Sequence, residues 1–132
     1  STIRDLNVNS KYFKKKFFFL KNSTNQNLFK EIKVKQIPLS KYVEENRIEN
    51  IDFIKIDTEG YELEVLKGAK EILYKAKYIL FEHHYDDMII KNYFFSDIHN
   101  FLKENNFKKL YKCKMPFRKT FEYIYENKTN KF

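Results

Sequence analysis

The sequence predicts an α/β fold, in which an open sheet ends in an antiparallel pair of strands. Two short apolar runs, residues 51–56 and 78–81, are each followed further along the chain by a segment whose apolar residues recur every three or four positions, the second after a linker. Two later runs, residues 107–113 and 120–126, are rich in aromatic side chains and flank a short turn segment. The resulting order of strand, helix, strand, helix, strand, strand favours helices packed on a sheet.

The N-terminal quarter is patterned weakly. Residues 1–30 read as irregular, with an aromatic run at residues 17–20 that is compatible with one short strand. The following segment "EIKVKQI", residues 31–37, alternates apolar side chains with Lys, and this period of two predicts a half-exposed strand. Pro38 would end that strand, and Ser40 is expected to cap a short helix over residues 41–46.

The run "IDFIKI", residues 51–56, does not alternate, so we expect both of its faces to be covered, as in a buried parallel strand. From Glu59 the period changes to that of a helix, with acidic residues in the first turns, where the helix dipole favours them. Gly68 inside this helix costs about 1 kcal/mol against Ala, which a close approach of the helix to the sheet would explain. The expected buried stripe is Val65, Leu66, Ala69, Ile72 and Leu73.

The segment "KYILFEHH" repeats the scheme, with a short strand at residues 78–81 that ends on an acid and two histidines. The linker "YDDMIIKNYFF" follows. Ser96 then starts a helix that ends near residues 105–106, with one apolar face made of Ile98, Phe101 and Leu102.

The composition excludes several classes of site. The net charge of +8 comes from 26 Lys and Arg against 18 Asp and Glu, but only three are Arg. Because bidentate readout of bases and phosphates favours Arg, nucleic-acid binding is not expected, and the Lys cluster at residues 14–16 is expected to be solvated. The only glycines are Gly60 and Gly68, so neither glycine-rich nucleotide-binding motif can be written.

Other features point to a reducing compartment. A single cysteine, Cys113, excludes an internal disulfide, so we expect a cytoplasmic protein in which Cys113 is a core residue. No apolar run is long enough for a membrane span, and no secretory signal is visible. His99 lies beside the apolar helix face and is expected at the surface.

Candidate functional residues follow the two apolar strands. In an open parallel sheet, ligands bind outside the carboxyl ends of the strands. Asp57 and Glu59 follow the first strand, and Glu82 and His84 follow the second, so a right-handed crossover would bring them to one edge. Such groups could accept a proton from a substrate hydroxyl or orient the positive end of a cofactor. Alternatively, Asp57 only caps the next helix and Glu59 only complements its dipole.

A metal site is not expected at this edge. His83 and His84 suggest metal ligands, with Asp57 or Asp86 as further candidates. However, adjacent side chains of a strand point to opposite faces of the sheet, so the two histidines cannot chelate one ion together.

At the level of motif, "IDFIKIDTEGYELEVLKGAKEIL" resembles the signature segment of the FkbM-type methyltransferases. The resemblance is carried by the pattern K-I-D-x-E-G-x-E-x-x-x-L-x-G-A, which starts at Lys55 and ends at Ala69. It extends more weakly over residues 31–84.

The resemblance implies a Rossmann-like sheet of seven strands whose last two form an antiparallel hairpin. It also implies S-adenosylmethionine as the cofactor and a methyl transfer to a hydroxyl oxygen of an acceptor, often a sugar or a natural product. Carried over, Asp57 and Glu59 would line the site, with Asp57 towards the cofactor, and Glu82 and His84 would join them from the next strand.

This chain departs from the family at its N-terminal side. The family's glycine-rich cofactor turn should lie before residues 1–30, so residues 1–132 are expected to be the C-terminal part of one methyltransferase domain. Residues 51–56 would then offer an open sheet edge. We expect the isolated chain to be marginally stable or self-associating, to bind S-adenosylmethionine weakly and to be inactive. The alternative is a non-catalytic α/β binding module whose Lys-rich face binds an anionic glycan or nucleic acid.

Overall fold

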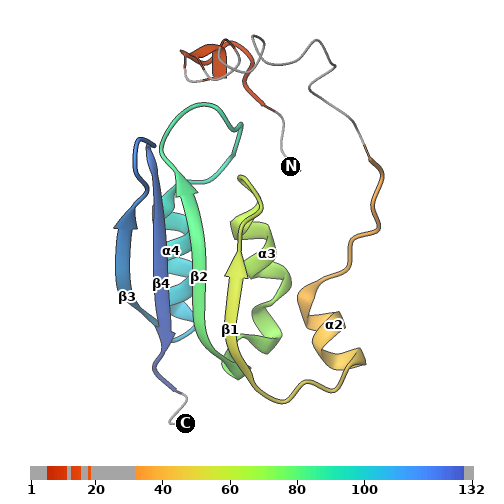
Figure 1. Cartoon of the computed structure of the whole chain (residues 1–132). Coiled ribbons are helices and arrows are strands. Elements are labelled where there is room, and N and C mark those ends of the chain that lie inside the picture. Colours follow the sequence, from red (N-terminus) through yellow and green to blue (C-terminus); the bar gives the residue numbers. More distant parts are fainter. Residues whose placement is uncertain (1–5, 12, 16–17, 19–31, 130–132) are drawn as a thin grey trace.

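The structure is a computed structural model that describes residues 6–11, 13–15, 18 and 32–129. It is a mixed α/β fold built on a four-stranded open sheet (Figure 1). The strand order is β1-β2-β4-β3, so the last strand lies between the second and the third. β4 is antiparallel to both of its neighbours, whereas β1 and β2 are parallel. The four strands are β1 (Ile51–Ile56), β2 (Ala76–His84), β3 (Phe107–Lys114) and β4 (Thr120–Asn127).

The crossover between β1 and β2 is helical, as the sequence predicts, but it is not one helix. α3 (Glu62–Gly68) is followed by its C-cap residue Ala69, and a 3-10 helix, η1 (Lys70–Lys75), continues to β2. The predicted apolar stripe is nevertheless the core of this layer. Leu66, Ala69, Ile72 and Leu73 are buried, and Val65 is partly buried against them.

The aromatic core lies between the sheet and α4 (Phe95–Glu104), which Figure 1 shows behind β2 and β4. Phe95 stacks on Tyr123 of β4, with ring centroids 4.4 Å apart, and on Phe81 of β2 at 6.5 Å. Phe81 in turn stacks on Tyr123 and Tyr125. These contacts fix the end of β2, and hence the candidate functional residues, relative to α4.

The predicted coverage of both faces of β1 is wrong. Ile54 and Ile56 are buried towards the helices, but Phe53 is 48% exposed and Lys55 is also exposed. The prediction failed because a run with four apolar residues in six can still alternate between a buried face and a solvent-exposed face of the strand. β1 also occupies one end of the strand order, so among the described residues it is an edge strand.

The predicted strand over residues 31–37 is also wrong for its described part. Residues 32–38 form neither helix nor strand, and Ile32 and Val34 are 70% and 68% exposed. Alternation alone cannot make a strand when no neighbouring strand accepts its hydrogen bonds. Ser40 does not cap the helix either, because α2 (Leu39–Glu45) already begins before it.

Gly68 has a different role from the one expected. It is the last residue of α3, and an added Cβ would meet Pro38 at 3.8 Å, which is ordinary van der Waals contact. The close neighbour is therefore the segment before α2 and not the sheet.

The N-terminal segment reaches the loop after β2. Leu6 forms an isolated antiparallel bridge with Ile89, and the Asn7 N–H donates to the Met88 carbonyl at 2.8 Å. Of the suggested strand at residues 17–20, Phe18 is helical, and the rest lies outside the described residues. No helix in the described part of the chain is long and apolar enough to cross a membrane.

Candidate functional site

The turn that follows β1 is held by a buried carboxylate. Glu59 and Gly60 have positive φ angles of 52° and 99°, so the chain makes a tight turn here instead of starting the helix. Both carboxylate oxygens of Glu62 accept the Gly60 N–H, at 3.0 and 3.1 Å. Glu62 Oε1 also accepts the backbone N–H and the hydroxyl of Thr58, at 3.3 and 3.2 Å. The shape of the turn is therefore set by Glu62.

Glu62 is only 1% exposed, and the Tyr93 hydroxyl, from the loop after β2, donates a hydrogen bond to its Oε2. A buried carboxylate is tolerated when several donors satisfy it, as here. Sequence reasoning placed Glu62 in the first turn of a helix and assigned it no site role. The available signal was an acid two residues after a turn glycine, close enough to reach back to the turn.

This turn carries Glu59 to His84 at the end of β2. Glu59 Oε2 lies 3.0 Å from His84 Nε2, and Asp86 Oδ2 lies 4.0 Å from Nδ1. Nδ1 also lies 3.0 Å from the hydroxyl of Thr120 on β4. Burial lowers the pKa of His84, but the hydrogen bond and charge of Glu59, helped by Asp86, outweigh burial and raise the pKa above its usual value. His84 thus joins three segments.

The other two candidate residues, Asp57 and Glu82, share the same edge of the sheet. Ile56 and Phe81 are register partners, so Asp57 and Glu82 follow them on adjacent parallel strands. Glu82 is only 9% exposed, and burial, followed by the charge of Asp57, raises its pKa. Asp57 remains exposed, with its Oδ2 3.6 Å from Lys55 Nζ. The structure therefore places Asp57, Glu59, Glu82 and His84 together, and we call these four residues the acidic edge.

The two histidines separate as adjacent strand residues should. His84 contacts Glu59 and Thr120, whereas His83 packs among the rings of Tyr85, Tyr93 and Phe95. Among the described residues, no group of three or more His, Cys, Asp or Glu side chains could hold a metal ion.

The comparisons with known proteins agree with the motif at this edge. Residues 4–109 match the family model described as the methyltransferase FkbM domain. The chain belongs to the FkbM methyltransferase family. No curated protein and no solved structure gives a significant match. The FkbM match contains the whole acidic edge, together with β1, β2 and α4.

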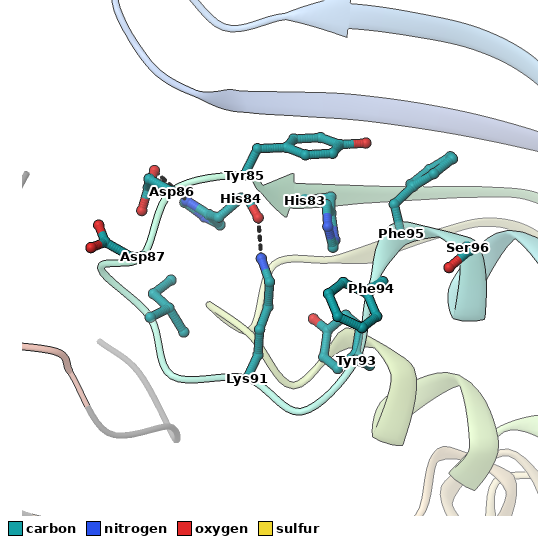
Figure 2. A pocket seen from close by; sticks show the side chains of 11 residues that line it. His83, His84, Tyr85, Asp86, Asp87, Lys91, Tyr93, Phe94, Phe95 and Ser96 are labelled. Atoms are coloured by element: carbon teal, nitrogen blue, oxygen red, sulfur yellow. Dashed lines mark hydrogen bonds and ion pairs between the residues drawn. The ribbon is translucent and has the colours of Figure 1, made fainter.

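A pocket in this FkbM domain lies beside the acidic edge, between the end of β2 and the loop that leads to α4 (Figure 2). Its volume is about 470 Å³. Figure 2 shows His83 and Lys91 pointing into the space between the strand and the loop. The Lys91 ammonium donates to the His84 carbonyl, and burial lowers its pKa, although the charges of Glu62 and Asp86 oppose that shift. Sequence reasoning missed Lys91 and Tyr93 because the linker has no periodic pattern.

Two predictions away from the edge need correction. His99 is not a free surface residue, because it is partly buried, stacks on Phe95 and has Nδ1 2.7 Å from the Tyr125 hydroxyl. Cys113 is not a core residue, because it lies partly exposed on β3. β3 packs on the sheet only through β4, so its side chains contribute little to the core.

Proposed function

We propose that this chain supplies the acceptor side of an S-adenosylmethionine-dependent methyltransferase that methylates a hydroxyl oxygen. One observation carries the proposal. Within the FkbM match, three carboxylates and a histidine from the turn after β1 and the end of β2 meet at the carboxyl end of two parallel strands. That is the edge at which open α/β sheets bind ligands. The inserted antiparallel β4 is also consistent with a Rossmann-like methyltransferase sheet.

The acidic edge fits one part of the cofactor. When bound, S-adenosylmethionine supplies an electrophilic methyl group on a positively charged sulfur. Asp57, an exposed carboxylate at the strand end, can face such a cation. Neither glycine supplies a glycine-rich cofactor turn, since Gly60 belongs to the turn held by Glu62 and Gly68 ends α3. We therefore assign only Asp57 to the cofactor and expect weak binding by this chain alone.

Glu82 is the proton acceptor in this proposal. Its pKa is raised by burial and by the nearby charges of Asp57 and Glu122, so it holds a proton more readily than an exposed Glu. A general base works best when its pKa lies near the working pH. A substrate hydroxyl that approaches the end of β2 could pass its proton to the carboxylate of Glu82.

Glu59 and His84 act as positioning residues. Both ring nitrogens of His84 already have neighbours, Glu59 at Nε2 and Thr120 at Nδ1, each at 3.0 Å. The side chain therefore ties the turn after β1 to β4, and it keeps the carboxylates of the acidic edge at a fixed spacing. This role differs from direct proton transfer. A substitution of His84 that kept the contacts with Glu59 and Thr120 would preserve positioning but not proton transfer.

The test follows transfer of a labelled methyl group from S-adenosylmethionine to a panel of hydroxylated compounds, using the natural protein with its whole reading frame. Glu82→Gln should lower the rate about 100-fold or more, since general bases contribute 10²–10⁴-fold. The matched control is Glu104→Gln, an exposed glutamate at the end of α4. A Glu82→Gln protein as active as the Glu104→Gln protein would refute the role of Glu82. Salt-sensitive polyanion binding without methyl transfer would instead favour a binding module.

A further inference from the structure

Most of the excess positive charge of the chain lies on β3 and on the turn that joins it to β4. The segment of residues 107–119 contains no Asp or Glu and six basic residues, all of them exposed: Lys108, Lys109, Lys112, Lys114, Arg118 and Lys119. The net charge of the whole chain is only +8. We call residues 107–119 the basic segment. Most of it lies beyond residue 109, where the match to the FkbM family model ends.

Apolar side chains are exposed among these charges. Leu110 and Tyr111 are 56% and 55% exposed, and Phe117 in the turn is fully exposed. Phe117 also has a φ of 60°, which bulky residues adopt rarely. The turn around it is held by its own backbone, because the Met115 N–H donates to the Thr120 carbonyl at 3.0 Å. The fold therefore presents the Phe117 ring to solvent from a defined backbone position.

Protection of the sheet edge does not explain this surface. Lysines on an edge strand prevent pairing with another strand, and β3 is the last strand of the described order. A shift in register between Lys109 and Tyr111 interrupts the same edge, so an added peptide strand would not pair well there. Edge protection gives no reason, however, for the exposed side chains of Leu110 and Tyr111. It also does not concern Phe117 and Arg118, which lie in the turn.

The nearby carboxylates leave this charge largely uncompensated. Glu122 and Glu126 on β4 lie beside β3 but are only partly exposed, and Glu126 accepts the Tyr78 hydroxyl at 3.2 Å. The acidic edge belongs to β1 and β2, and β4 separates β2 from β3, which Figure 1 shows at the outer side of the sheet. Neighbouring strands lie about 4.8 Å apart, so two strand spacings are about 10 Å, and salt screens charges over about 8 Å.

We propose that the basic segment binds the surface of an anionic lipid bilayer, with Phe117 inserted at the interface and the lysines against the headgroups. Apolar insertion and attraction to anionic lipids act together in such binding. Tyr111 suits the interface, because its ring is apolar and its hydroxyl is polar. Lysines are compact point charges that headgroups can neutralise without a fixed geometry. The proposal is independent of methyl transfer.

Single-stranded nucleic acid is the other polyanion that basic and aromatic side chains bind together. Proteins of that kind hold the strand in a positively charged groove, whereas Figure 1 shows the turn between β3 and β4 projecting at the end of the sheet. Five of the six cations are Lys, although bidentate contacts to phosphate favour Arg. Leu110 cannot stack on a base, but lipid can cover it. These features favour the bilayer.

The chain contains no tryptophan, so Phe117→Trp places a single fluorescent reporter in the turn. The full chain with this substitution is titrated with vesicles of equal parts phosphatidylcholine and phosphatidylserine, and separately with vesicles of phosphatidylcholine alone. The anionic vesicles should shift the emission to shorter wavelengths as the indole enters an apolar layer, and high salt should reverse the shift. The control is Phe53→Trp, whose emission should not change, because β1 lies at the opposite end of the strand order.

Co-sedimentation with the same anionic vesicles measures the contribution of charge. Lys109→Gln combined with Lys114→Gln should weaken binding about fivefold for each charge removed. The matched control combines Lys33→Gln with Lys35→Gln, which removes the same net charge at two exposed lysines before α2 and should weaken binding less than about twofold. Lys112 is left in place, because its ammonium lies over an aromatic ring of β4.

Three results would overturn the proposal: no emission shift in the Phe117→Trp protein, equal binding to phosphatidylcholine alone, or equal effects of the two lysine pairs. A single-stranded DNA oligonucleotide is titrated into the Phe117→Trp protein as well, and it should leave the emission unchanged. If the oligonucleotide changes the emission and the vesicles do not, the basic segment is a nucleic-acid surface and the bilayer proposal fails. Methyl transfer is not measured in these experiments, so the proposed function is tested separately.

Discussion

Both carboxylate oxygens of Glu62 accept the Gly60 N–H, at 3.0 and 3.1 Å from the glycine nitrogen. The two residues are neighbours across a turn in which Glu59 and Gly60 both have positive φ. Non-glycine residues adopt this conformation rarely, so the turn needs outside support. The acidic edge therefore depends on a carboxylate that does not belong to it.

We predict that Glu62→Gln destabilises the fold by about 1–3 kcal/mol. The reason is that a neutral amide replaces a carboxylate that accepts hydrogen bonds from four protein donors. The measurement is the free energy of unfolding in urea. The matched control is Glu45→Gln on α2, whose ion pair with Lys41 is exposed on both sides and should matter by less than about 0.5 kcal/mol. Equal effects of the two substitutions would show that the hydrogen bonds from Gly60 to Glu62 add no stability.

Two histidines should respond in opposite directions to the same substitution. His83→Phe should stabilise the fold by about 1 kcal/mol or more, because it removes the buried, unpartnered Nδ1 while keeping a ring among aromatic neighbours. His99→Phe should destabilise it by a similar amount, because the buried hydroxyl of Tyr125 loses its partner at 2.7 Å. Thermal unfolding of both variants checks this. A loss of stability in His83→Phe would mean that His83 has a partner in solution.

How far the sequence predicts this arrangement depends on the range of the interactions. β1, the β3–β4 pair and the meeting of Asp57 with Glu82 follow from local patterns and from the crossover rule. The hydrogen bonds to the Glu62 carboxylate do not follow from local patterns, because they need the positive φ values of the turn and Tyr93, which is 31 residues away. The exposure of Phe53 could not be predicted either, since a short apolar run has the same sequence pattern whether one or both faces of the strand are covered.

The contact between Glu59 and His84 should make stability depend on pH. The pKa of His84 is raised above 6.5 in the fold, so the folded protein binds this proton more tightly than the unfolded chain does. The stabilisation is complete below about pH 6.5 and is lost as the pH rises through the folded pKa. Urea unfolding between about pH 5.5 and pH 9 measures this loss.

Glu59→Gln tests the cause of that pH dependence. Gln cannot attract the imidazolium, so the decrease in stability above about pH 6.5 should become smaller. Asp57→Asn is the control, because Asp57 pairs with Lys55. An unchanged pH profile in Glu59→Gln would assign the pH dependence to another group.

The open edge of the sheet leads to the last prediction, that the isolated chain self-associates through β1. Among the described residues β1 has a neighbouring strand on one side only, and Phe53 in its middle is 48% exposed. Unpaired backbone groups beside an exposed apolar side chain favour pairing with a second strand, and a lysine on an edge strand opposes it. Sedimentation velocity should show concentration-dependent association that Phe53→Lys reduces, whereas Phe117→Lys, in the turn between β3 and β4, should not. A chain that remains monomeric at all concentrations would contradict the prediction, and a Phe117→Lys protein that dissociates equally would move the contact away from β1.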